Sequence, residues 1–197
     1  MKIIITIWAL IVSRFSFAQE KEPPPPPPPP SIEAYKCIYS KRFSDTARLQ
    51  LYPFNEYQTI KLVSFRYHAD NSPIKENRVV EDSLLEKVTL SKRDILALTD
   101  VLYNNYLKGE VPPIEPMCSF VPRNAILFFD ANKQLKEFVV ICFHCSDYEK
   151  SNEKVNTGDD CMEKLEKLRR LFIAKGLKFG TNKNIERYPG ETGLCCD

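Results

Sequence analysis

Two apolar runs joined by a turn constrain the fold of this chain more than any other feature. The first run is Asn124–Phe129 and the second is Phe138–Phe143, and the residues Asp130–Lys133 that follow the first run are typical of a turn. Neither run alternates apolar with polar residues, so each strand is expected to be covered on both faces or to lie centrally in a sheet. The pattern predicts a β-hairpin over about residues 123–143.

Two amphipathic segments, at about residues 92–107 and 161–175, predict helices that pack on this sheet. Ser91 and Asp160 are the expected N-terminal caps, and Gly176 marks the end of the second helix. The apolar stripe of the second helix includes a first-turn cysteine and consists of Cys161, Leu165, Leu168 and Phe172.

Upstream of the first helix, β-branched and aromatic residues predict strands at about 35–39, 47–52 and 59–67. Residues 146–159 are expected to form a polar loop. The chain from residue 32 to residue 180 is therefore predicted to be a single α+β domain, with an antiparallel sheet, a central hairpin, two helices and disulfide staples.

The first 31 residues form two accessory segments. Residues 1–18 combine a positive start with an apolar run and small residues before Ala18, which predicts a cleaved signal peptide; retention as a membrane anchor is the alternative. Residues 19–31 contain the eight prolines Pro23–Pro30, and such a run predicts an extended polyproline II tail or linker. At the other end, residues 181–197 are expected to be a polar tail.

The charge of the chain argues against a nucleic-acid partner. The 28 Lys and Arg residues are nearly balanced by 26 Asp and Glu residues, and removal of Lys2 and Arg14 with the signal would leave 26 against 26. The mature protein is expected to be exported, periplasmic or secreted, with no transmembrane helix after processing.

Four of the seven cysteines flank the hairpin and the second helix: Cys118, Cys142, Cys145 and Cys161. A turn at residues 131–132 would place Cys118 opposite Cys145, and the inward-facing Cys161 could then reach Cys142. Two structural disulfides suit an exported chain. A tetrahedral zinc site made of the same four thiolates is the second interpretation.

The third interpretation is redox catalysis, because the C-F-H-C sequence at residues 142–145 superficially resembles the C-P-H-C centre of thioredoxin-like oxidoreductases. Those enzymes place the attacking cysteine at a helix N-terminus, whereas Cys142 ends a predicted strand. The remaining cysteines are Cys37, Cys195 and Cys196, and a tail cysteine could bond to Cys37. Because seven is odd, one thiol is left for a protein partner or a covalent dimer.

No other catalytic motif stands out in the sequence, which predicts no cofactor and picks out no catalytic or metal residue. A non-enzymatic binding or structural module is the leading hypothesis, and enzymatic activity is left open. The alternative is a thiol-disulfide or zinc-dependent protein centred on the C-F-H-C motif.

A family resemblance rests on two motifs. The segment P-R-N-A-I-L-F-F-D at residues 122–130, preceded by Cys118, is followed by the C-F-H-C motif and then by the helix that carries Cys161. Over residues 85–181 this pattern resembles a group of exported bacterial proteins. The resemblance implies an extracytoplasmic setting and no established activity.

Overall fold

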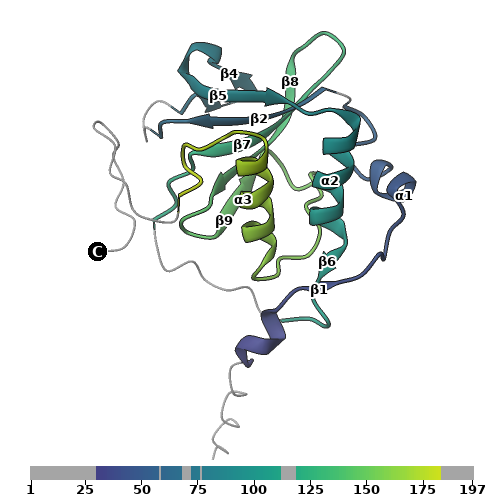
Figure 1. Ribbon diagram of the computed structural model, residues 1–197. Coiled ribbons are helices and arrows are strands. Elements are labelled where there is room, and N and C mark those ends of the chain that lie inside the picture. The colour runs from purple at the N-terminus through teal and green to yellow at the C-terminus, as the bar shows by residue number, and fades with distance from the viewer. Residues whose placement is uncertain (1–29, 58, 68–71, 76, 112–118, 183–197) are drawn as a thin grey trace, which may run out of the picture.

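The computed structural model describes residues 30–57, 59–67, 72–75, 77–111 and 119–182 (Figure 1). Its centre is a five-stranded antiparallel sheet with the strand order β5-β2-β7-β8-β9. The strand bounds are β2 Thr59–Phe65, β5 Leu84–Thr89, β7 Asn124–Phe129, β8 Leu135–Cys142 and β9 Asp147–Lys150. The α+β class and the central hairpin are therefore as the sequence predicts.

The strand β7 is buried at every position, because both faces of the sheet are covered. Ile126 and Phe128 belong to the core beneath the helices, whereas Ala125 and Leu127 belong to a second cluster on the opposite face. Two clusters around one strand explain why its sequence does not alternate. The second cluster includes Ile74, from the small hairpin formed by β3 Ile74–Lys75 and β4 Arg78–Val79.

The register of the β7–β8 hairpin differs from the predicted one by two residues. Asn124 lies opposite Ile141, and the pairing shifts between Phe128 and Phe129. The turn is longer than expected because the Asp130 carboxylate accepts the N–H groups of both Asn132 and Gln134, each at 2.9 Å. The expected alignment of Cys118 with Cys145 was based on the shorter turn, and Cys118 lies outside the described residues.

Helix α2 spans Lys92–Tyr103 and starts with the predicted capping box. The Asp94 N–H donates to Oγ of Ser91 (3.3 Å), and the Ser91 N–H donates to the Asp94 carboxylate (3.2 Å). The helix ends four residues earlier than predicted. The chain instead enters β6 Asn105–Tyr106, which pairs with β1 Ile38–Tyr39.

Helix α3 spans Lys164–Ala174 and lies beside α2 (Figure 1). Its C-terminus is a Schellman motif: the Leu177 N–H donates to the carbonyl of Phe172 (3.1 Å), and Gly176 has a φ of 90°. Leu165, Leu168 and Phe172 form the buried stripe of the helix as predicted. Cys161 is also buried, but it lies before the helix, which starts three residues later than predicted. Asp160 does not cap the helix; its carboxylate instead accepts the hydroxyl of Tyr148.

Three sequence predictions outside these elements were wrong. Residues 47–52 do not form a strand, because Ser44 caps a short helix, α1 Asp45–Leu49. The predicted strand at 35–39 is divided between a 3-10 turn at Ile32–Tyr35 and the two-residue β1. The expected polar loop at 146–159 contains the edge strand β9.

A second 3-10 turn, Glu81–Ser83, precedes the edge strand β5. Within the part of the chain described by the structure, every helix is too short or too polar to cross a membrane.

Candidate functional site

A hollow with a volume of about 160 Å³ lies where the segment after β1, the end of α2 and the loop before α3 meet. Phe43, Tyr103 and Tyr106 provide aromatic walls. Arg42 and Asp159 bring one positive and one negative charge to the same space. Apolar walls with a few convergent polar groups are typical of small-molecule sites.

The Arg42 guanidinium is stacked against two of these rings. Its central carbon lies 5.4 Å from the Phe43 ring centroid and 5.3 Å from that of Tyr106. The side chain is exposed, and none of the described carboxylates forms an ion pair with it. The two ring contacts restrict the position of the guanidinium and leave its N–H donors available to an anion.

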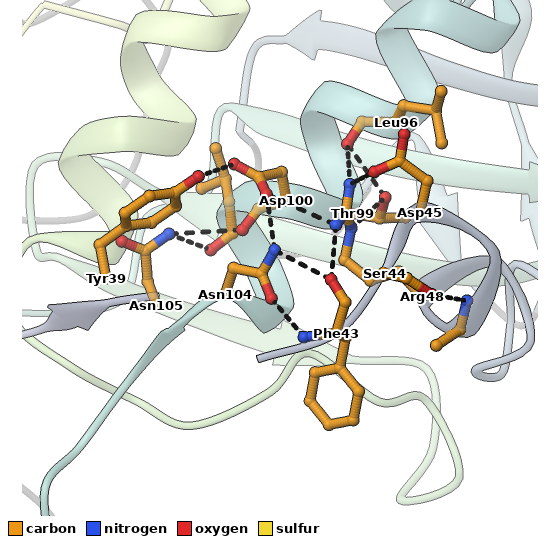
Figure 2. Close-up of polar contacts among 12 residues, drawn as sticks. Tyr39, Phe43, Ser44, Asp45, Arg48, Leu96, Thr99, Asp100, Asn104 and Asn105 are labelled. Atoms are coloured by element: carbon orange, nitrogen blue, oxygen red, sulfur yellow. Dashed lines mark hydrogen bonds and ion pairs between the residues drawn. The ribbon is translucent and has the colours of Figure 1, made fainter. Parts of the chain in front are cut away.

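The buried Asn104 holds the segment that carries Arg42 and Phe43 (Figure 2). The Phe43 N–H donates to Asn104 Oδ1 (3.0 Å), and Asn104 Nδ2 donates back to the Phe43 carbonyl (3.3 Å). The Ser40 N–H donates to the Asn104 carbonyl (3.1 Å). One asparagine thus pairs with this segment much as a neighbouring strand would.

Arg48 supports the same segment from α1 and is only 4% exposed. It donates to the Phe43 carbonyl (2.9 Å), to the Thr99 hydroxyl (3.3 Å) and to the Asp45 carboxylate (2.8 Å) (Figure 2). Asp100 lies 3.6 Å from the guanidinium and accepts Nδ2 of Asn104 (2.7 Å). The buried charge is therefore paired and hydrogen-bonded, as a stable buried ion requires.

The opposite wall is the loop at residues 156–159. The Tyr103 hydroxyl donates to the Asn156 carbonyl (2.9 Å), and the Leu107 N–H donates to the Asp159 carboxylate (3.3 Å). Gly158 has a φ of 70°, and a Cβ built on it would lie 2.3 Å from the Leu102 carbonyl oxygen. Only glycine fits this close approach between the loop and α2.

Lys164 lies behind Gly158 and is 2% exposed. Its Nζ donates to the Thr157 carbonyl (2.9 Å). Burial lowers the pKa of Lys164 to about 8, although the carboxylates of Asp160 and Asp159 favour the charged form.

Tyr148 completes the polar group around this lysine. Its hydroxyl lies 2.8 Å from the Thr157 hydroxyl and donates to the Asp160 carboxylate, and burial raises the Tyr148 pKa. The loop that forms one wall of the hollow is therefore fixed from behind by a buried amine and a half-buried phenol.

The cysteines predicted as site residues do not come together as expected. Cys161 forms a disulfide with Cys37, with a Cα–Cα distance of 5.0 Å, so its predicted pairing with Cys142 was wrong. The idea that a tail cysteine bonds to Cys37 was wrong for the same reason. The turn that precedes α3 packs on the N-terminal segment, where the Met162 N–H donates to the Tyr35 carbonyl (2.9 Å) and the Cys37 N–H donates to the Glu163 carboxylate (2.7 Å).

Cys142 is the last residue of β8, and Cys145 lies in the turn that follows it. Cys142 is 2% exposed, and its Sγ accepts the Cys145 N–H (3.3 Å); the Cys145 Sγ donates to the Ser119 carbonyl (2.9 Å). Because Cys161 is bonded to Cys37, the four-thiolate zinc site, which was the second interpretation of these cysteines, cannot form. Within the described ranges, no three His, Cys, Asp or Glu side chains are grouped as metal ligands.

In a second buried polar group, the carboxylate of Glu137 is hydrogen-bonded by neighbouring side chains. This carboxylate on β8 is 7% exposed and accepts hydrogen bonds from Tyr52, Ser151 and Asn152, the last at 2.6 Å. These donors come from the loop after α1 and from the segment after β9, so the carboxylate joins both segments to the sheet.

Sequence reasoning missed the hollow because its residues come from three distant segments. The one local signal is the Asn104-Asn105 pair, since two asparagines are poor helix formers and mark the end of α2. Comparison with known proteins gives no match: no family model, no curated protein and no solved structure is significantly similar to this chain.

Proposed function

We propose that this chain is an exported, non-enzymatic binding module that takes a small polar ligand into the hollow beside Arg42. The observation that carries the proposal is the stacked Arg42 guanidinium, which no described carboxylate neutralises and which faces a 160 Å³ space. Export is supported by the signal-like N-terminus and by the Cys37–Cys161 disulfide.

Preorganisation supports binding at this position. Asn104 and Arg48 fix the wall that carries Arg42, and both side chains are themselves buried and hydrogen-bonded. A ligand therefore has little chain to order when it binds, which is where much of the free energy of association is otherwise lost. The volume equals about five times the share of one water molecule in the liquid, which suits a ligand or ligand group of a few non-hydrogen atoms.

The test is a nuclear magnetic resonance titration of the mature chain with a panel of small carboxylates, amino acids, amines and sugars. We expect at least one class to shift the amide signals of Tyr106 and Gly158, and the Arg42→Met variant to lose that response. Arg93→Met is the matched control, because Arg93 is an exposed arginine on α2 that does not line the hollow. Shifts that survive in Arg42→Met, or a panel without any response, would contradict the proposal.

A second candidate function is thiol-disulfide exchange centred on Cys142 and Cys145. The hydrogen bond from the Cys145 N–H to the Cys142 sulfur favours it, because the bond holds the two cysteines of the motif next to each other. The near-complete burial of Cys142 opposes it. Rapid alkylation of Cys142 in the folded protein, read by mass spectrometry, would support this function, and protection until unfolding would exclude it.

A further inference from the structure

The hollow carries two charges of opposite sign that do not neutralise each other by a direct contact. Arg42 and Asp159 line the same space, and no ion pair joins either of them to another described residue. Lys164, a cation behind the loop at residues 156–159, gives its hydrogen bond to the Thr157 carbonyl and does not line the hollow. The Asp159 carboxylate accepts a single described hydrogen bond, from the Leu107 N–H.

Both side chains are exposed, so a ligand in the hollow displaces part of the water around each charge. A ligand with one charge would pair with one of these groups and displace water from the other without compensating it, which reduces the free energy of binding. A ligand with both charges would compensate the two groups at once. The walls of the hollow therefore select for a molecule that carries an anionic and a cationic group a few bonds apart.

We propose that the ligand is a small zwitterion of the α-amino-acid type, with its carboxylate on Arg42 and its ammonium group at Asp159; this rests on the proposed binding function. The guanidinium presents paired N–H donors, a geometry that matches a carboxylate. The Tyr103 ring lines the same space as Asp159 and can contact the cationic group of the ligand. Leu51 and Phe43 offer apolar surface to a small side chain.

The test uses two sets of ligands. Within each set, the compounds differ only in their charged groups. L-leucine is compared with 4-methylpentanoate, which lacks the ammonium group, and with 3-methylbutylamine, which lacks the carboxylate; L-alanine, propionate and ethylamine form the smaller set. We expect the amino acid of at least one set to bind the mature chain at least about tenfold more tightly than either analogue, measured by calorimetry, a ratio equivalent to 1.4 kcal/mol.

Two variants test which side chain of the protein binds which charged group of the ligand. Arg42→Met should weaken binding of the amino acid and of the carboxylate analogue alike. Asp159→Asn, which keeps an oxygen to accept the Leu107 N–H, should reduce the amino acid to the affinity of its carboxylate analogue and should not weaken the analogue. Asp82→Asn is the control, because Asp82 is an exposed acid in the 3-10 turn before β5. Thermal melts check that each variant is folded.

The possible failures are distinguishable. If the carboxylate analogues bind as tightly as the amino acids, or if Asp159→Asn has no effect, the zwitterion assignment is overturned while the binding module stands. If a compound of another chemical class binds in the hollow and no amino acid does, the zwitterion assignment is likewise overturned while the binding module stands. If no compound in the panel perturbs the residues of the hollow, both proposals fail.

Discussion

At the scale of single residues, Gly158 has the most demanding backbone position among the described glycines. Its positive φ and the 2.3 Å approach of a Cβ to the Leu102 carbonyl predict that Gly158→Ala lowers the free energy of unfolding by about 1–3 kcal/mol. Gly109→Ala is the control, because nothing lies within 4 Å of its Cβ position. Urea unfolding measures both; equal effects of the two variants would show that the close approach is not real.

Lys164 makes stability depend on pH. Burial lowers its pKa to about 8 in the folded protein, below the usual 10.5, so between these values the unfolded chain binds more protons than the folded one. The free energy of unfolding should therefore rise with pH above about 8, and this contribution should vanish in Lys164→Met. We expect the difference between wild type and variant to change by about 1–2 kcal/mol from pH 7.5 to 9.5. A difference independent of pH would contradict the low pKa.

The sequence identifies buried apolar residues better than buried polar ones. Leu168 and Phe172 follow from helical periodicity, because burial of a stripe needs only a sheet to cover it. Lys164 lies in a run of charged residues that is typical of a solvated face, and its burial depends on the distant Thr157 carbonyl. The same holds for Arg48 and Asn104, whose partners are set by tertiary contacts.

At the scale of elements, Glu86 attaches the segment after α3 to the edge strand β5. Its carboxylate accepts the N–H groups of Lys178 and Phe179, each at 3.0 Å, and the Ser64 hydroxyl at 2.7 Å. Glu86→Gln should lower the free energy of unfolding by about 1–3 kcal/mol, because an amide cannot accept all of these donors as well as a carboxylate does. Amide exchange at Lys178 and Phe179 should also become faster.

Glu149 on the opposite edge strand, β9, provides the matched control, since its side chain is exposed. Glu149→Gln should leave both the stability and the exchange of Lys178 unchanged. Similar losses in the two variants would indicate a general charge effect rather than a specific attachment.

Elements with strong local signals are predictable from this sequence, and the others are not. The capping box at Ser91 and the Schellman end at Gly176 both form as predicted. The predicted register of the hairpin was wrong because one carboxylate, that of Asp130, lengthens the turn. The strand β9 was missed because a polar edge strand lacks an apolar pattern, and its pairing with β8 is what defines it.

At the scale of the whole molecule, the Cys37–Cys161 disulfide closes a loop of 124 residues. Such a bond restricts the unfolded chain, so Cys37→Ala or Cys161→Ala should lower the free energy of unfolding by about 2–5 kcal/mol. The double variant should lose no more than the larger single loss, because either substitution already removes the bond. Additive losses in chemical denaturation would show that the two cysteines act separately.

The architecture was predictable at this scale, but the candidate site was not. A hairpin buried on both faces and two amphipathic helices are enough to predict an α+β domain. The hollow forms only after residues 42–43, 103–106 and 156–159 converge, and nothing in a single sequence reports which segments meet. The disulfide partner of Cys161 was missed for the same reason.

The disulfide also determines how the domain would respond to mechanical load. A force applied to the chain on the N-terminal side of Cys37 passes through the sulfur bridge directly to the start of α3, so the residues between the two cysteines bear no tension. These residues include the whole sheet and α2. Stretching the protein by its ends should therefore leave roughly 400 Å of contour length hidden, at about 3.3–3.6 Å per residue, until the bond is reduced.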